Sequence, residues 1–271
     1  MAVRHAGTSL DGCGDGFQAM RALRVPVSYG SPDFPTIKQG VIMDAALWAT
    51  GLAGAAFFIS HLGLAHPPVH DRIVGRIGEK GFQGVYLLAT LVTLGGMIAG
   101  YIYAPHHLYL WIPGPGVRHL PLLIMPLAFI LIAGGVLTPN PSALGMEGNL
   151  DRADAARSVL RITRHPVMWG LTLWATVHIV ANGDLASLLF FSGFLLTALL
   201  GSLHLDWRMA TTEGERWQRF AAVTSHVPFV AILSGRQTWG WAELGRPAAW
   251  GLGVFVVLLL LHPSLFGVRP Y

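Results

Sequence analysis

Residues 164–184 read RHPVMWGLTLWATVHIVANGD. No charged side chain lies between Arg164 and Asp184, and a helix that crosses a membrane needs about 20 mainly apolar residues. The stretch therefore predicts a membrane-spanning helix. It also contains His165 and His178, and polar side chains in a membrane interior are costly enough that each calls for a physical reason.

The composition of the whole chain extends this prediction. Of the 271 residues, 53% are hydrophobic and 12% are charged, whereas soluble domains carry about 25% charged residues. We expect an all-α, polytopic transmembrane helix bundle with about six spanning helices. The candidate windows are 44–64, 84–103, 120–137, 167–181, 185–205 and 248–262. No polar block between them is long enough to fold alone, so residues 43–271 form one predicted transmembrane domain.

The distribution of basic residues predicts the orientation. The first, third and fifth connections hold Arg72, Arg76, Lys80, Arg152, Arg157, Arg161, Arg164, Arg208, Arg216, Arg219, Arg236 and Arg246. The other two connections and the C-terminus hold only Arg118 and Arg269. Because Lys and Arg are enriched on the cytoplasmic side, we expect both termini to lie outside the cytoplasm.

Residues 1–42 do not fit this orientation, since they contain Arg4, Arg21, Arg24 and Lys38. They also lack the apolar core and the cleavage pattern of a signal peptide. Met43 stands immediately before the first apolar window. We expect a disordered leader, or natural translation that begins at or near Met43.

Two further features limit the possible partners. The basic residues form no cluster with interleaved aromatics, which argues against nucleic acid. The single cysteine, Cys13, excludes an internal disulfide, a thiolate-bound iron–sulfur cluster and covalently attached haem.

The motif Gly96-x-x-x-Gly100 predicts close helix packing, either inside the bundle or in a homo-oligomer.

Histidines are the main candidates for chemistry. His61 lies near the end of the first window, and His178 shares a helical stripe with Leu171 and Trp174. Each is either a polar residue bonded to its own helix or a metal ligand. A zinc site would need further ligands in an H-E-x-x-H or C-x-x-C pattern, which the chain lacks. Two histidines on facing helices could instead hold a noncovalent haem between them.

The motif Arg164-His165-Pro166 begins the fourth window. Pro166 suits the first position of a helix. Arg164 and His165 are either interfacial anchors or a polar mouth that binds an anionic group, such as a haem propionate or a cofactor carboxylate.

Two other polar motifs flank the fifth window. Asn182-Gly183-Asp184 predicts a tight turn in which Asp caps the next helix and Gly takes a positive φ. The segment LHLDWR at 203–208 places His204, Asp206 and Arg208 at the cytoplasmic boundary, where they pair with one another or bind a soluble cofactor.

Four segments resemble one known family, in the same order along the chain. They are ISHLGL (59–64), GEKGFQGVY (78–86), LYLWIPGPGVRHL (108–120) and TRHPVMWGLTLWATVHIVANGDLASLLFFSGFLLTALLGSLHLDWR (163–208). This pattern is similar to the NnrU family of bacterial membrane proteins, which are associated with denitrification and nitric oxide metabolism. Its plant and cyanobacterial relatives are zeta-carotene isomerases, haem b enzymes of the membrane that isomerise a central cis double bond when the iron is reduced.

The resemblance implies haem b held by His61 and His178, with Arg164, His165 and Trp174 as further cofactor contacts. Ala175 occupies the position of a proposed alternate Cys ligand, so we expect no ligand exchange of that kind. The implied partners are membrane lipids and a lipophilic polyene or nitric oxide, with a possible homo-oligomer. The implied location is a bacterial inner membrane with periplasmic termini.

The implied iron ligands differ in expected depth. With six simple spans, His61 and His178 lie roughly 15 to 20 Å apart along the membrane normal, at 1.5 Å per residue. One solution is a deep hairpin whose turn at 182–184 stops inside the bundle. The other is that His61 pairs with His165 or His204.

Two alternative functions also fit the sequence. In a membrane methyltransferase, Arg164, His165, Glu213 and Glu215 would surround S-adenosylmethionine, since such enzymes also begin a helix with RHP-x-x-x-G. A non-enzymatic assembly factor for a respiratory complex would explain an apolar bundle without strong acid–base groups.

Overall fold

The computed structural model describes residues 44–143 and 145–270, and the leader expected at 1–42 lies outside them. Six long helices make up this part: α2 (Ala45–Ala65), α3 (Pro67–Tyr103), α5 (Leu120–Leu137), α6 (Pro166–Asn182), α7 (Leu185–Thr212) and α10 (Trp241–Phe266). Short helices are α4 (Pro115–Arg118), η1 (Glu147–Asp151), η2 (Ser158–Arg161), α8 (Glu215–Val223) and α9 (Val230–Leu233). The described residues form no β-strand, and the prediction of an all-α fold is confirmed.

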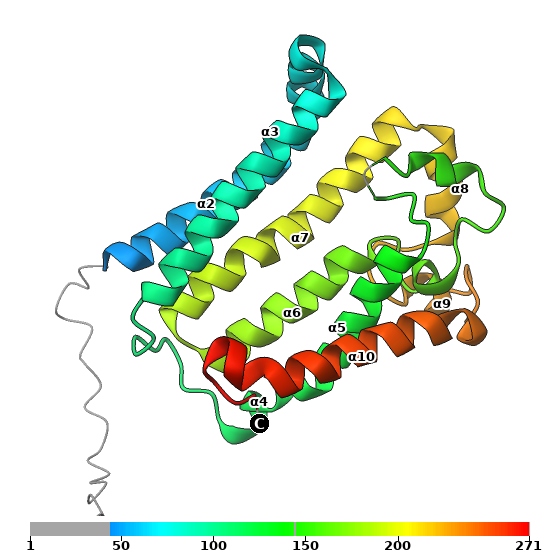
Figure 1. Ribbon diagram of the computed structural model, residues 1–271. Coiled ribbons are helices and arrows are strands. Elements are labelled where there is room, and N and C mark those ends of the chain that lie inside the picture. The colour runs from blue at the N-terminus through cyan, green and yellow to red at the C-terminus, as the bar shows by residue number, and fades with distance from the viewer. Residues whose placement is uncertain (1–43, 144, 271) are drawn as a thin grey trace, which may run out of the picture. The chain divides into compact units, whose positions relative to one another are not determined.

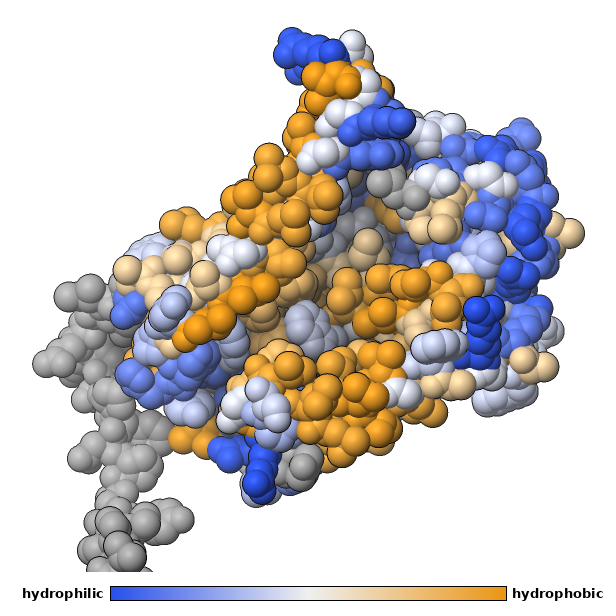
Figure 2. All heavy atoms as spheres, in the orientation of Figure 1, coloured by the Kyte–Doolittle hydropathy of each residue, from blue (hydrophilic) through white to orange (hydrophobic). Residues whose placement is uncertain are grey.

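The long helices stand side by side in one curved row (Figure 1). α2 packs against α3 on one side and α7 on the other, α6 lies between α7 and α5, and α10 packs on α5. One face of this row is hollowed between the arm formed by α2 and α3 and the other helices (Figure 2). The candidate site lies at this hollow.

Five of these helices are long and apolar enough to cross a membrane. α6, at 17 residues, is shorter but lies inside the row. Large apolar side chains on the outermost helices, α3 and α10, are exposed; Leu260, for example, is 69% exposed. Such surfaces suit contact with lipid, because lipid tails are as apolar as the side chains themselves.

Helices α3 and α10 begin earlier than predicted. The first connection, expected as a loop near residues 65–83, is helical from Pro67 onward, because a proline at the first helical position is already fixed at a helical φ. Gly78 interrupts α3 with φ 73° and ψ 168°. A residue without Cβ adopts that conformation at little steric cost.

The Gly96–Gly100 motif packs α3 against α2. A Cβ at Gly100 would lie 2.6 Å from Oγ1 of Thr50, and one at Gly96 would lie 3.2 Å from Cβ of Ala53. The two helices therefore approach closely only because these positions are glycine. The interpretation as packing inside the bundle is confirmed.

The turn between α6 and α7 has the predicted local structure. Gly183 has φ 75°, and the Asp184 carboxylate accepts a hydrogen bond from Ser187 N at 2.9 Å. Asp184 is buried, and it also lies 3.3 Å from Nδ1 of His106. These contacts explain why the Asp184 carboxylate is buried, so its burial is no evidence of a catalytic role.

The prediction that this turn stops deep inside the bundle is wrong. Gly183 O accepts a hydrogen bond from Leu110 N at 2.8 Å, within the segment that follows α3. Nearby, Leu47, Ala104 and Ala186 form one buried cluster. The turn therefore lies where α2 begins and α3 ends, and the loop at 108–111 supplies partners for its backbone groups.

Gly251 sets the distance between α10 and α5, and its substitution is a test of the helix row. A Cβ there would lie 2.7 Å from the backbone N and Cα of Ile130, which cannot move as a side chain can. We expect Gly251→Val to lower the free energy of unfolding by about 1–3 kcal/mol. The control is Gly253→Val, where a Cβ meets nothing within 4 Å. Equal unfolding temperatures of the two variants would contradict this packing.

Candidate functional site

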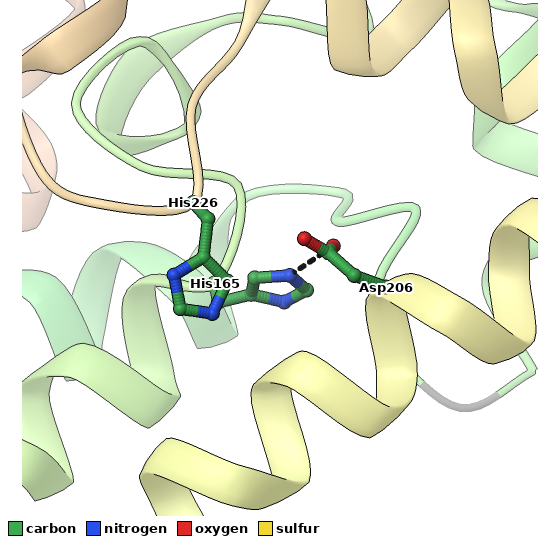
Figure 3. A group of neighbouring side chains, drawn as sticks. All are labelled: His165, Asp206 and His226. Carbon is green, nitrogen blue, oxygen red and sulfur yellow. Dashed lines mark hydrogen bonds and ion pairs between the residues drawn. The ribbon is translucent and has the colours of Figure 1, made fainter.

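The motif at 164–166 is bound by an acid from α7. Asp206 Oδ1 accepts hydrogen bonds from Arg164 Nε at 2.8 Å and from His165 Nε2 at 2.6 Å, and Oδ2 lies 2.5 Å from Arg164 Nη2. Figure 3 shows the His165–Asp206 contact. The expectation that His165 is an interfacial anchor is wrong, because this residue is 2% exposed. Its alternative role, contact with an anionic group of a cofactor, stays a prediction. Asp206 also pairs with Arg164 rather than with its neighbour Arg208.

These bonds fix the protonation pattern of the His165 ring. A carboxylate only accepts, so His165 Nε2 carries the hydrogen and Nδ1 keeps a free lone pair. Nδ1 is buried and has no hydrogen-bond partner within the described part of the chain. An unpaired buried acceptor is uncommon in folded proteins and calls for an explanation.

His226 lies next to His165, with ring centroids 5.3 Å apart. Ser202 Oγ donates its hydrogen to Leu199 O at 2.8 Å, so His226 Nε2 donates to Ser202 Oγ at 2.9 Å. Three atoms that could act as metal ligands, one each from His165, Asp206 and His226, all lie within 4.8 Å of one another (Figure 3). However, hydrogens occupy Nε2 of both imidazoles, and the Arg164 cation neutralises the carboxylate. We interpret the cluster as a hydrogen-bond network rather than a metal site.

The two imidazoles of this network should make stability depend on pH. Burial lowers the pKa of His165 and of His226 below the ordinary value of 6.5. As the pH falls through 6.5, the unfolded chain therefore binds protons before the folded protein does, and folding becomes less favourable.

We accordingly expect a lower unfolding temperature at pH 5.5 than at pH 7.5. This difference should shrink in His226→Gln, while substitution of the exposed His107 to Gln leaves it unchanged. An unfolding temperature of the parent protein that stays constant over this pH range would contradict the assignment.

A cavity of about 280 Å³ opens beside His165, and its walls are mostly apolar. α2, α3, the segment 140–147, the start of α6 and α7 all contribute to it. Its lining residues are His61, Leu62, Ala65, Phe82, Tyr86, Asn140, Ser142, Ala143, Glu147, His165, Val167, Met168, Thr197, Gly201, His204, Leu205 and Arg208. The structure thus brings three of the candidate histidines to one cavity: His61, His165 and His204.

Each of these histidines has a ring nitrogen without a protein partner in the described residues. His61 Nδ1 donates to Phe57 O at 2.8 Å, which leaves its Nε2 with a lone pair. His204 Nε2 is buried without a partner, as is His165 Nδ1. Three imidazoles therefore line a mostly apolar cavity, and the unpaired nitrogens of His165 and His204 are themselves buried.

His178 does not line this cavity. Its Nδ1 donates to Trp174 O at 2.7 Å, and its ring stacks on Phe191 with centroids 4.9 Å apart. Leu62 packs near Gly201 on α7, whereas His178 is level with Phe191. The two candidate ligands are therefore separated by about 14 Å along the helix axes, at 1.5 Å per residue.

Aromatic rings fill the space between His61 and His178. Phe57 contacts His61 at 4.0 Å and Phe194 at 5.3 Å between centroids, and Phe194 contacts Trp174 at 5.0 Å. Trp174 then contacts His178 at 5.6 Å. The structure does not bring these two histidines together, so their joint ligation of one iron stays a prediction.

The residues expected around S-adenosylmethionine are also separated. Arg164 is occupied by Asp206, and Glu213 pairs with Arg216, which also binds Asp151. Glu215 does not line the cavity. The geometry therefore does not support the methyltransferase alternative.

Two aromatic residues of the cavity wall, Phe82 and Tyr86, were not singled out as site residues from the sequence. Both lie in the GEKGFQGVY segment, and its resemblance to the family motif was the sequence feature that could have marked them as site residues. Phe82 is buried, and Tyr86 contacts the His61 ring at 5.3 Å between centroids.

A row of apolar helices with a cavity that opens at one end defines a polytopic helical membrane protein. The family model described as NnrU protein matches residues 50–270. The chain belongs to the NnrU family.

Two curated relatives carry the same name. The 15-cis-zeta-carotene isomerase of Arabidopsis thaliana chloroplasts is 29% identical over 190 residues, which cover 67% of this chain and 49% of that protein. The protein of that name from Zea mays is 34% identical over 79 residues, or 29% of this chain and 22% of that protein. The chain thus matches half or less of the length of these relatives. No solved structure matches it.

Proposed function

We propose that this protein is a membrane isomerase of a lipophilic polyene, and that the polyene binds in the cavity lined by His61, Phe82 and Tyr86. The observation that carries the proposal is the cavity itself: it is mostly apolar and lies between helices of a membrane protein. The names of the two relatives support the substrate class.

The cavity residues would bind and orient the polyene. Phe82, Tyr86 and Met168 offer apolar and polarizable surface to a conjugated chain, and burial of that chain excludes water. His61 places an uncharged ring nitrogen at the wall, held by its bond to Phe57 O. These contacts would hold one segment of the polyene fixed while a double bond in it rotates.

Haem b is the proposed cofactor on the strength of the family resemblance. Reduced haem iron would supply the group on which isomerisation depends in the related isomerases. His61 and His178 do not fit one iron as they stand, because Phe57, Phe194 and Trp174 lie between them. His204 or His165, which line the same cavity as His61, is the alternative partner of His61.

Absorption spectroscopy of the purified protein tests the cofactor. We expect a Soret band that disappears in His61→Ala and persists in His107→Ala, which alters an exposed loop histidine. Comparison of His178→Ala, His165→Ala and His204→Ala identifies the second ligand as the variant that also loses the band. Colourless parent protein from haem-replete cells would contradict the haem proposal. It would not contradict the polyene site, which the isomerisation assay tests separately.

A second candidate, nitric oxide chemistry linked to denitrification, rests on the family alone. It requires an iron centre, so it depends on the same spectra. A haem band that shifts on addition of nitric oxide, with no effect of the protein on polyene isomers, would favour it.

We also propose that the cavity lies at the cytoplasmic end of the bundle in a bacterial inner membrane. The described connections at 66–83, 138–165 and 213–240 share this end with the cavity and contain ten of the fourteen Lys and Arg residues that the structure describes. That bias is typical of cytoplasmic loops. Cysteines introduced at Glu215 and at His107 should react with an impermeant thiol reagent from opposite sides of the membrane.

A further inference from the structure

The cavity proposed for the polyene is too small to enclose a carotene. Its volume is about 280 Å³, which is just below the range of about 300–1,000 Å³ found for sites of drug-sized ligands. A carotene is a long, thin chain with more atoms than such a ligand. Most of the molecule must therefore lie outside the cavity, on a surface that continues from its wall.

One face of α7 provides this continuation. Thr197, Gly201 and Leu205 line the cavity. Phe194 and Phe190 precede them at spacings of three and four residues, so these positions share one face of the helix. Both phenylalanines are partly exposed. This face of α7 therefore leads from the cavity along the hollow between the arm of α2 and α3 and the other helices (Figure 2).

Aromatic rings line the face beyond the cavity. Phe194 contacts Phe57 of α2 at 5.3 Å and Trp174 of α6 at 5.0 Å between ring centroids. Farther along, Phe190 lies 5.4 Å from Phe194 and stacks on Tyr101 of α3 with centroids 4.5 Å apart. Phe57 is buried, whereas the other four rings are partly exposed. They offer apolar, polarizable surface to a conjugated chain.

We infer that the polyene occupies an extended site, in which one end lies in the cavity and the rest runs along α7 past Phe194 to Phe190. This inference rests on the proposed function, because it places the same ligand. From Leu205 to Phe190 the helix rises about 22 Å at 1.5 Å per residue. Phe190, at the far end, contacts long polyenes only and so determines which length of polyene binds tightly.

Two hydrocarbon polyenes of different length test the extended site. 15-cis-zeta-carotene, named in both relatives, is long enough to pass beyond the cavity, whereas anhydroretinol is shorter and does not reach Phe190. Both quench tryptophan fluorescence, so their affinities for the purified full chain in detergent are measured by titration. Each variant is compared with the parent protein for the same polyene, which cancels the partition of that polyene into detergent.

Phe190→Ala removes the ring at the far end. We expect it to weaken the binding of 15-cis-zeta-carotene by about tenfold, on the order of one aromatic contact, and to leave the affinity for anhydroretinol unchanged. The control is Phe255→Ala on α10, whose ring is also partly buried and contacts Phe129 at 6.2 Å between centroids. It should change neither affinity. If Phe190→Ala does not fold, Phe190→Leu keeps an apolar side chain and still removes the ring.

The outcomes separate this inference from the proposed function. An unchanged affinity of the Phe190 variant for 15-cis-zeta-carotene would overturn the extended site and leave the cavity as a ligand site. Equal losses for the two polyenes would also overturn it, because the ring would then act on the cavity itself. Failure of the parent protein to bind either polyene would overturn the proposed function as well.

Discussion

Asp206→Asn should lower the free energy of unfolding by about 3 kcal/mol, since breaking a buried ion pair leaves an uncompensated charge behind. Asp206 joins α7 to the start of α6 through Arg164 and His165, and the Arg164 and Asp206 side chains are only 14% and 19% exposed. Asn keeps the shape of Asp but has no charge. Its amide oxygen can also replace only part of the carboxylate's acceptor capacity.

Glu243→Gln is the matched control for this prediction. Glu243 pairs with Arg161; the side chain of Arg161 is 23% exposed and that of Glu243 is 37% exposed. Like Asp206, Glu243 connects segments that are distant in sequence. More exposed ion pairs contribute less, typically below about 1 kcal/mol. Unfolding in detergent, followed by circular dichroism, measures both variants, and equal losses would contradict the special role of Asp206.

Gly201→Leu should abolish ligand binding without harming the fold. Gly201 lines the cavity on α7, and a Cβ there would meet only Leu62 Cδ1, at an ordinary 3.8 Å. The added side chain has room in the cavity and therefore occupies the space of the ligand. Leu also favours a helix by about 1 kcal/mol over Gly, so stability should be kept or raised.

Gly63→Leu makes the same change on α2, where a Cβ meets nothing within 4 Å and the residue does not line the cavity. We expect this control to bind 15-cis-zeta-carotene, the compound in the names of the two relatives, as the parent protein does. Affinity of Gly201→Leu for the same probe should fall by about a hundredfold or more, because overpacking a filled site is costly. Unchanged affinity would place the ligand site elsewhere.

The helical framework was predictable because it follows from local patterns. Each of the six apolar windows became a long helix, and the motif at 182–184 correctly indicated a capped turn with Gly183 at positive φ. The predicted starts of helices were less accurate. The polar residues before the apolar window at 84–103 are also helical, and α3 begins at Pro67.

The site was predictable only in part, because its key contacts join segments distant in sequence. Both RHP and LHLDWR stood out as motifs, yet nothing local shows that Asp206 accepts from His165 rather than pairing with Arg208. The depth of the turn at 182–184 was misjudged for the same reason, since its partners come from residues 108–111. His61 was correctly placed near one end of its helix, but which histidines share its cavity depends on the parallel packing of α2 and α7.

In the proposed function, the cavity binds a lipophilic polyene and isomerises it. The most direct test incubates the purified protein, in detergent with a reductant, with 15-cis-zeta-carotene, the compound in the names of both relatives, and resolves the isomers by chromatography. We expect loss of the 15-cis isomer with the parent protein and with Gly63→Leu, but not with Gly201→Leu. An isomer distribution that folded, haem-supplied parent protein leaves unchanged would contradict the proposed function.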